Sequence, residues 1–443
     1  MTAPQQGLVA RFMKTASRIE ANEVRAVWIS FAFVFTLMAA YYILRPVRDA
    51  MASDWTDTEV SLLWNINFFI SVGVVALYGV AVSKLRFRIL VPGVYAFFAA
   101  SFVAFYFGVT ALSDRVLIDK IFYVWVSVFS LFHVSVFWSF MSDLFDKEQS
   151  GRLFAFIAAG SCAGALVGPV VPTLFAGMVG TDTLMLVASV ALLVPIPMIF
   201  YLERLKVVDL NNADVRADLS AARIGGKPFA GFKMFFTNPY LLAIGAFILL
   251  YTAIGSFVYF EQKNLLADFD RATRTQILGG VDLVVNVLTF GIGMFATGRI
   301  VKRFGMPTTL ALVPVLIAAG LLILAFAPIL TIVLALQVAR RAGNYAITRP
   351  GREMLFTAVD RETRFKAKPV IDIAVYRGGD AVSSIAFAGL TDGLGLGLGV
   401  MAAIGAGIAA VWAAVGRYLG RVFERGEAAD AKPAATPLAP DSG

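Results

Sequence analysis

The sequence predicts an all-α membrane protein with twelve transmembrane helices arranged in two six-helix halves. Hydrophobic residues make up 59% of the 443 residues and charged residues 15%, whereas a soluble domain averages about 45–50% apolar and 25% charged. Mean hydropathy is +0.77. Val27–Leu44 and Leu310–Ala327 each run for eighteen residues without a charged side chain, and roughly 20 apolar residues cross a hydrocarbon core. These observations exclude a soluble multi-domain protein.

The twelve predicted spans follow one another along the chain, each ending where charged or turn-forming residues interrupt the apolar run. They are 27–48, 60–83, 89–112, 118–144, 153–178, 184–202, 240–260, 275–298, 308–327, 329–357, 369–391 and 396–423. Such blocks recur along almost the whole chain, as expected of a polytopic helical membrane protein.

The longest polar connection, 203–238, divides the spans equally and is interpreted as a cytoplasmic linker. It separates an N-terminal six-helix half, 27–202, from a C-terminal six-helix half, 239–425. The segment 1–26 is expected to be cytoplasmic and to contain an interfacial helix, because its apolar and basic side chains face opposite sides. The tail 426–443 is rich in Ala, Pro and Asp and is expected to be disordered.

The distribution of Lys and Arg predicts that both termini are cytoplasmic. With that orientation, 26 of the 38 basic residues lie in inner segments and 7 in outer segments, as the positive-inside rule requires. We therefore expect an integral protein of a bacterial inner (plasma) membrane. The net charge of +8 follows from this topology and from attraction to anionic lipid, so no nucleic-acid partner is expected.

A weak internal repeat relates the two halves. The second and eighth spans end in a glycine followed five residues later by a basic residue: Gly79 and Lys84, then Gly298 and Arg303. At the same separation, Asn67 in the second span corresponds to Asn286 in the eighth. Parallel six-helix halves are the plan of the major facilitator superfamily, and both segments resemble its cytoplasmic loop motif without the usual aspartate.

The fifth span carries a stripe of glycines, Gly160, Gly164 and Gly168, followed by Pro169. Small residues at this spacing are typical of close helix packing in membranes. The segment 164–169 also resembles part of the antiporter motif of the same superfamily. Both interpretations remain open at this stage.

Charged residues inside the predicted spans point to a polar pathway, because ionisable groups at membrane depth are costly unless they face water or a partner. In the tenth span, Arg341, Tyr345, Thr348 and Arg352 fall on one face at 100° per residue. This face cannot contact lipid. Since Arg binds phosphate and carboxylate oxygens through two parallel hydrogen bonds, the stripe predicts a polyanionic substrate.

Further ionisable residues lie in the neighbouring spans. The eleventh span carries Asp372, Arg377 and Asp380, and the eighth carries Asp282. A pair formed by Arg377 with either aspartate would be structural rather than functional. The sequence leaves open whether these residues form a structural ion pair or a coupling site.

Three segments resemble the ATP/ADP translocase family, the nucleotide transporters of plastids and intracellular bacteria, which share the major facilitator architecture. They are Ile43–Asp49, Glu261–Lys263, and a C-terminal group made of Arg352–Met354, Lys366–Lys368, Val370–Asp372 and Arg377. By this resemblance, Arg48, Glu261 and Lys366 or Lys368 match charged residues needed for nucleotide exchange. Arg48 and Arg352 replace lysines of the family pattern, and Pro369 is foreign to it.

We therefore predict an alternating-access secondary transporter that moves a nucleotide or similar phosphorylated polyanion by ATP/ADP-type exchange. The expected substrate-binding residues are Tyr41, Arg48, Asn67, Asn286, Arg341, Tyr345, Arg352, Lys366 and Lys368. The expected coupling or gate residues are Glu261, Lys263, Asp282, Asp372, Arg377 and Asp380. The expected partners are the anionic solute and membrane lipid, and the protein is expected to be a monomer.

Two other functions are alternatives. The first is a proton-coupled symporter or exporter of another organic anion, with Asp282, Asp372 or Glu261 carrying the proton. The second is an integral-membrane enzyme, which is disfavoured by the chemistry of the chain. The sequence has one His and one Cys and lacks a Gly-Lys-Ser/Thr phosphate loop. No catalytic residue, metal or cofactor is expected.

Overall fold

The computed structural model describes residues 19–84, 87–210, 212, 230–359, 367–368 and 370–430. Within these ranges the chain is helical and contains no β-strand, which confirms the predicted all-α class. Nine of the described helices are long and apolar enough to cross a membrane. Helical segments also occupy the other three predicted spans, 60–83, 329–357 and 369–391, so the structure is consistent with twelve spans.

The chain forms two compact units. Unit 1 comprises Met1–Arg223 and Lys263–Val287, and unit 2 comprises Ile224–Gln262 and Leu288–Gly443. The segment Lys263–Val287 follows the linker in the chain and is grouped with unit 1. The ion pairs described below explain this assignment.

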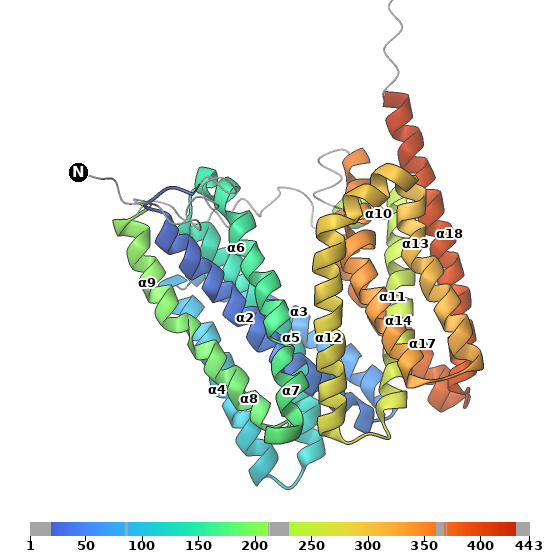
Figure 1. The fold of residues 1–443 in the computed structure, drawn as a ribbon, viewed down its shortest axis with the longest axis horizontal. Helices are drawn as coiled ribbons and strands as arrows, with labels where there is room; N and C mark the ends of the chain where they lie inside the picture. Colours follow the sequence, from blue (N-terminus) through green and yellow to red (C-terminus); the bar gives the residue numbers. More distant parts are fainter. Residues whose placement is uncertain are drawn as a thin grey trace, which may run out of the picture. The chain divides into compact units, whose positions relative to one another are not determined.

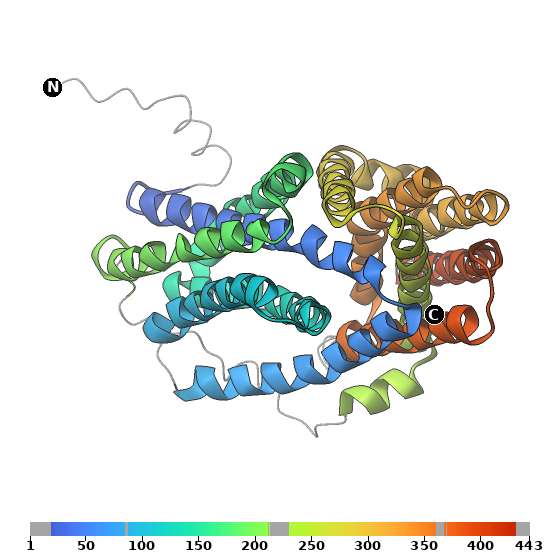
Figure 2. The same ribbon diagram turned by 90° about the horizontal axis from the view of Figure 1, so that it is seen from below.

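The helices of unit 1 are drawn in blue to green in Figure 1. They are α2 (Val24–Met51), α3 (Asp57–Lys84), α4 (Phe87–Ala111), α5 (Arg115–Leu144), α6 (Lys147–Val167), α7 (Val170–Val179), α8 (Thr183–Leu193) and α9 (Pro195–Val208). The first part of α12 (Arg271–Phe295) joins them. Within the unit, α2 packs against α5, α6 and α8 (Figures 1 and 2).

Unit 2 is built around the pair of long helices α13 and α18, which pack along much of their length. Its α-helices are α10 (Ala230–Thr237), α11 (Pro239–Leu266, up to Gln262), α13 (Thr297–Phe326), α14 (Leu330–Gly343), α15 (Arg349–Leu355), α17 (Tyr376–Ala388) and α18 (Leu398–Asp430). Since α18 continues to Asp430, the first residues of the tail expected to be disordered are helical. The rest of that tail and the expected N-terminal interfacial helix lie outside the described residues.

The glycine stripe of the fifth span allows α6 to approach α2 closely. A Cβ atom added at Gly160 would lie 2.5 Å from the carbonyl oxygen of Phe31, and one at Gly168 would lie 2.7 Å from that of Ala39. Gly164 faces the carbonyl of Phe35 in the same way. Real Cβ atoms do not approach backbone oxygens this closely, so the structure confirms the packing interpretation of the stripe.

Several predicted continuous spans are interrupted helices. The fifth is split at Gly168 and Pro169 into α6 and α7, and the sixth is split at Val194 into α8 and α9, because proline cannot continue the hydrogen-bond ladder of the preceding turn. In the tenth, a π-helical segment, Asn344–Thr348, separates α14 from α15. This last interruption matters for function, since it changes which side chains share a face.

Candidate functional site

Arg48, near the end of α2, is held by neighbours on two helices. Its Nε and Nη2 atoms donate to Oδ1 of Asp49 at 2.9 and 2.6 Å. Its Nη1 atom donates to Ser127 Oγ of α5 at 3.2 Å, and its guanidinium lies 5.5 Å from the ring centroid of Tyr123. The Arg48 charge is therefore already paired with a carboxylate.

Two side chains of α12 face α2 one turn apart. Arg45 Nη1 lies 3.7 Å from Asp282 Oδ1, and Arg45 Nε lies 3.6 Å from Asp49 Oδ2. One turn further along, the Tyr42 hydroxyl donates to Asn286 Oδ1 at 3.3 Å, and Asn286 donates to the carbonyl of Ala165 at 2.7 Å. Asp282 is thus the counterion of an arginine, and Asn286 ties together three helices of unit 1.

Tyr41 and Asn67 lie in different surroundings. The Tyr41 ring stacks on His133 of α5 with centroids 4.7 Å apart and planes inclined by 27°. Asn67 of α3 accepts a hydrogen bond from Ser71 of the same helix at 3.4 Å. Tyr41 therefore lies two helical turns from Arg48 on α2, against the single histidine of the chain.

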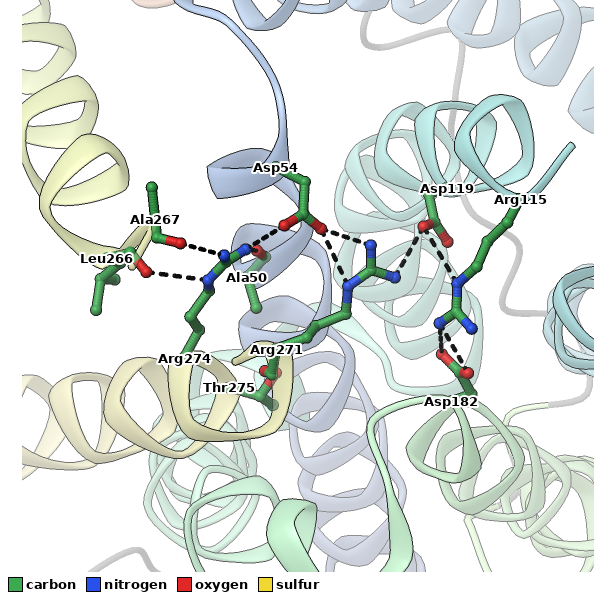
Figure 3. Close-up of polar contacts among 10 residues, drawn as sticks. All are labelled: Ala50, Asp54, Arg115, Asp119, Asp182, Leu266, Ala267, Arg271, Arg274 and Thr275. Carbon is green, nitrogen blue, oxygen red and sulfur yellow. Dashed lines mark hydrogen bonds and ion pairs between the residues drawn. The ribbon is translucent and has the colours of Figure 1, made fainter. Parts of the chain in front are cut away.

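The start of α12 carries two arginines that bind Asp54, in the 3-10 turn Ala52–Asp54 after α2, and Asp119 of α5 (Figure 3). Arg271 donates to Asp119 Oδ2 at 2.8 Å and to Asp54 Oδ2 at 2.5 Å. Arg274 donates to Asp54 Oδ1 at 2.5 Å and to the backbone carbonyls of Ala50, Leu266 and Ala267. These bonds join the α11–α12 connection to the N-terminal helices.

The network extends through Asp119 to Arg115, and a separate ion pair joins Lys263 to Asp57. Arg115 pairs with Asp182 at 2.9 Å and lies 3.7 Å from Asp119. Lys263 donates to Asp57 Oδ1 at 2.7 Å and to the Trp55 carbonyl at 2.6 Å. The Lys263 and Asp57 side chains are each 4% exposed, which makes theirs the most deeply buried pair of the group.

We name this network the α2–α12 charge cluster. It contains seven basic and seven acidic residues, each in at least one ion pair. The basic members are Arg45, Arg48, Arg115, Lys120, Lys263, Arg271 and Arg274, and the acidic members are Asp49, Asp54, Asp57, Glu59, Asp119, Asp182 and Asp282. The cluster has no net formal charge.

Asp270 lies beside the cluster and begins α12. Its carboxylate accepts from the Thr273 backbone N–H at 3.0 Å and from the Thr273 hydroxyl, the arrangement of a helix N-cap. The Thr273 hydroxyl and backbone hydrogen bonds hold the pKa of Asp270 below its ordinary value. This cap positions the first turn of α12, from which Arg271 and Arg274 project.

Sequence reasoning missed most of the cluster. Arg271 and Arg274 were counted as outer-segment charges, and Asp54, Asp57 and Asp119 were not singled out. The available signal was the concentration of acidic residues at the ends of the first, second and fourth predicted spans. Their charge is opposite to that of the basic residues in the α11–α12 connection. Pairing partners separated by more than 200 residues, such as Lys263 and Asp57, cannot be deduced from spacing.

In unit 2, the predicted polar face of the tenth span is not uniform. Arg341 is 5% exposed and Thr348 is also buried, whereas Tyr345 is 37% exposed. The prediction assumed 100° per residue throughout, but the π-helical turn Asn344–Thr348 advances by a smaller angle. It therefore rotates the residues after Gly343 relative to α14.

The C-terminal group of residues singled out by the family resemblance does come together. Arg352 lies 3.0 Å from Glu353 and 3.3 Å from Asp372. Lys368 lies 2.6 Å from Glu353 and 3.8 Å from Asp372, and its ammonium lies 5.5 Å from the Phe356 ring centroid. Two cations and two carboxylates thus form one exchangeable set of pairs. Lys366 lies outside the described residues.

The remaining candidates of unit 2 lie on α11 and α17. Glu261, near the end of α11, is fully buried. Asp380 of α17 interacts electrostatically with Arg377 of the same helix and with Arg340 of α14. Within the part of the chain that the structure describes, neither arginine lies within ion-pair distance of Asp380, so the expected local pair of Arg377 and Asp380 is not formed.

The family comparison decides the class of the protein. A model described as the Major Facilitator Superfamily matches residues 27–346, which is more than half of the chain. This chain belongs to the major facilitator superfamily. No curated protein sequence matches the chain.

Solved structures share the superfamily fold. A nucleoside transporter, NupG, is 13% identical with a TM-score of 0.62, covering 90% of this chain and 99% of that one. A bacterial homologue of the iron transporter ferroportin, in an inward-facing state, is 12% identical with a TM-score of 0.63 and the same coverage. A bacterial homologue of the human lysosomal transporter Spinster is 15% identical with a TM-score of 0.54, covering 92% and 99%.

At these identities the likeness establishes the fold and not the solute. As a member of the major facilitator superfamily with nine described apolar helices of membrane-crossing length, the protein is an integral membrane secondary transporter rather than an enzyme. Its substrate is a small molecule, whose chemistry has to be inferred from the charged side chains above.

Proposed function

We propose that this transporter works by alternating access and exchanges a nucleotide or a similar phosphorylated polyanion in ATP/ADP-type antiport. The observation that supports this proposal is the excess of positive charge in one part of unit 2. We name the described residues from Leu330 to Ala388 the basic segment. It carries six basic and three acidic residues: Arg340, Arg341, Arg349, Arg352, Lys368 and Arg377, with Glu353, Asp372 and Asp380.

The chemistry of the basic segment suits phosphate better than a neutral solute. Arg340 is buried and its direct hydrogen-bond partners are neutral, whereas a buried cation requires a compensating negative charge. A guanidinium binds phosphate oxygens in a planar bidentate manner. A phosphorylated solute entering this region would supply the charge that the three carboxylates leave uncompensated.

The resemblance to ATP/ADP translocases adds independent support. Arg352, Glu353, Lys368 and Asp372, which carry the most specific part of that resemblance, form one set of ion pairs. Exchangeable pairs of this kind can release a cation to an incoming phosphate and recapture it after the phosphate leaves. We therefore assign Arg352 and Lys368 as substrate contacts, with Glu353 and Asp372 as their resting partners.

In the same proposal, the α2–α12 charge cluster is the gate. Arg271 and Arg274 follow the linker in the chain, yet their carboxylate partners precede it. Alternating access requires bonds that form in one state and break in another. A charge-balanced cluster suits this role, because its members can re-form pairs without leaving a net charge behind.

The test is uptake of labelled ATP into liposomes that contain the purified full-length protein and are loaded with ADP, with phosphate or with buffer alone. We expect uptake that requires internal ADP. An Arg421→Gln variant, which alters an exposed residue of α18, is the matched control and should transport like the wild type.

The alternative outcomes are specific. Uptake of another organic anion that follows an imposed pH gradient, with no response to internal ADP, would replace the proposal by proton-coupled transport. Lack of ATP uptake under all three loading conditions, from protein shown to be folded, would refute nucleotide exchange and leave the transporter class unchanged.

A further inference from the structure

We propose that Arg340 of α14, together with Gln337, Tyr251 and Gly255, forms an anion-binding subsite within unit 2 that holds one phosphate group of the transported solute. The assignment of phosphate rests on the proposed function. Arg340 itself is assigned from its own surroundings. Helical periodicity had placed its neighbour Arg341, not Arg340, on the polar face.

Arg340 is a buried cation whose direct partners are neutral. Its side chain is 8% exposed. Nε and Nη2 donate to Gln337 Oε1 at 3.1 and 2.7 Å, and Nη1 lies 3.5 Å from the Tyr251 hydroxyl. Among the described residues, no carboxylate oxygen lies within 4.0 Å of an Arg340 nitrogen. By contrast, each cation of the α2–α12 charge cluster has a carboxylate within that distance.

Such a charge is expensive to retain. An ionised side chain buried without a counterion destabilises a protein strongly, and in a membrane helix an arginine is expected to mark a functional site. A neutral residue of similar shape would pack in the same position without this penalty. The retention of arginine therefore points to an anion that is present during the transport cycle.

The hydrogen bonds leave two N–H groups of the guanidinium available. Arginine has five N–H groups, and Gln337 and Tyr251 account for three of them. Because Gln337 occupies Nε and one hydrogen of Nη2, and Tyr251 occupies one hydrogen of Nη1, the two remaining N–H groups are one on Nη1 and one on Nη2. Both can donate charge-assisted hydrogen bonds to oxygens of a phosphate.

The helix opposite α14 makes room for this group. A Cβ atom added at Gly255 of α11 would lie 3.2 Å from Arg340 Nη1, so the absence of a side chain at Gly255 allows the guanidinium to lie this close to α11. One turn earlier, the Tyr251 ring centroid lies 5.8 Å from the guanidinium carbon. Tyr251 is itself flanked by Tyr376 and Trp412, with centroids 6.2 and 5.7 Å away. The guanidinium is thus held against an aromatic wall.

Asp380 sets the resting charge of the subsite. Its carboxylate exerts a longer-range attraction on both Arg377 and Arg340, although none of the described carboxylate oxygens lies within 4.0 Å of an Arg340 nitrogen. A carboxylate at this longer range compensates the Arg340 charge only in part. An anion that binds at Arg340 would therefore be attracted by Arg340 and Arg377, and the negative charge of Asp380 would weaken that attraction.

The decisive variant is Gln337→Glu. It keeps the size of the side chain and the position of the acceptor oxygen, but it gives Arg340 the carboxylate that it lacks. If Arg340 has a structural role alone, this change should leave binding intact and raise the melting temperature. If Arg340 binds the anion, the new ion pair should compete with it and weaken binding by roughly 10- to 100-fold.

The measurement is equilibrium binding of ATP, pyrophosphate and citrate to the purified full-length protein, with melting temperature recorded for each variant. We expect Arg340→Met to lose binding and to melt at a higher temperature than the wild type without ligand. Arg340→Lys should retain weak binding because it keeps the charge but not the bidentate geometry. Arg421→Gln is the unchanged control.

The outcomes separate this proposal from the proposed function. Wild-type binding of ATP that persists in folded Gln337→Glu and Arg340→Met would overturn the subsite and leave nucleotide exchange standing. Binding of pyrophosphate or citrate but not ATP, lost in both variants, would support the subsite and refute the nucleotide. If none of the three anions binds the folded wild type, the subsite is refuted as well.

Discussion

The α2–α12 charge cluster and the basic segment of unit 2 differ in the balance of basic and acidic residues. In the cluster, seven basic residues meet seven acidic residues, and every member is in an ion pair. In the basic segment, six basic residues meet three acidic ones, and Arg340 has neutral partners. In the sequence, both regions are groups of charged residues within a mostly apolar chain, yet the ratio of basic to acidic residues differs between them.

This difference in charge balance distinguishes a structural role from a solute-binding role, which amino-acid composition alone cannot do. Paired charges in a low-dielectric region hold helices in place, because breaking a buried pair leaves one charge uncompensated. Unbalanced charges favour an external partner of opposite sign. We therefore assign the cluster to conformational control and the basic segment to solute binding, and the following predictions test that division.

The largest expected effect is on transport. Arg341→Glu places a negative charge in the basic segment, and like-charge repulsion of several kcal/mol corresponds to a loss of at least about 100-fold. Uptake of the anion into liposomes should therefore be abolished while membrane insertion remains normal. The matched change in the cluster, Arg271→Gln, should lower the melting temperature and leave anion binding measurable. Normal uptake by Arg341→Glu would remove Arg341 from the site.

The next effect is on the stability of unit 1. Lys263→Met leaves the buried Asp57 carboxylate without its ammonium partner, which should destabilise the protein by about 3–5 kcal/mol. Replacing both residues, as Lys263→Met with Asp57→Leu, removes the uncompensated charge and should restore most of the loss. Denaturation of the purified variants measures both. Equal stability of the single variant and the wild type would show that this pair is not structural.

A smaller effect is expected at Asp380. Asp380→Asn removes a carboxylate that attracts Arg377 and Arg340 from longer range, so the attraction of the subsite for an anion should increase. At the effective dielectric of a protein interior we expect binding to become roughly three- to tenfold tighter. Titration of the purified variant with the anion measures this change. Weaker binding would show that Asp380 orients the arginines rather than competing for them.

The smallest effect concerns Asp270, an exposed charge outside both regions. Its pKa is lowered in the folded state by the hydrogen bonds from Thr273, so its cap stabilises α12 above the ordinary pKa of 3.8. This stabilisation is lost as the pH falls through the lower, folded-state value. Asp270→Ala should slightly lower the melting temperature at neutral pH and leave it unchanged at strongly acid pH. A pH-independent difference would contradict the cap.

Much of the fold was predictable from local patterns. Long apolar blocks require membrane helices because backbone groups must be hydrogen-bonded inside lipid, and nine of the described helices coincide with predicted spans. The glycine stripe of α6 also acts as its spacing indicated. The π-helical turn after Gly343 was not predictable, since it depends on how α14 packs, and it altered the face on which Tyr345 lies.

The site was predictable in kind but not in arrangement. The sequence identified Arg48, Lys263, Asp282, Arg352 and Lys368 as charges that need partners. It could not tell that Arg48 pairs with Asp49 beside it and Lys263 with a residue of α3. Helical periodicity placed Arg341 on the polar face and left Arg340 out, and the neutral partners of Arg340 became visible only in the structure.

By itself, the sequence determined that this protein is a polytopic α-helical transporter with a basic C-terminal region, because hydropathy and charge are properties of residue types. The tertiary structure alone decided which charges are neutralised. Whether an arginine of a membrane helix faces an aspartate, as the partly buried Arg45 faces Asp282, or a neutral glutamine and tyrosine, as the buried Arg340 does, depends on contacts between helices far apart in the chain. The free energy of a buried charge is set by those contacts.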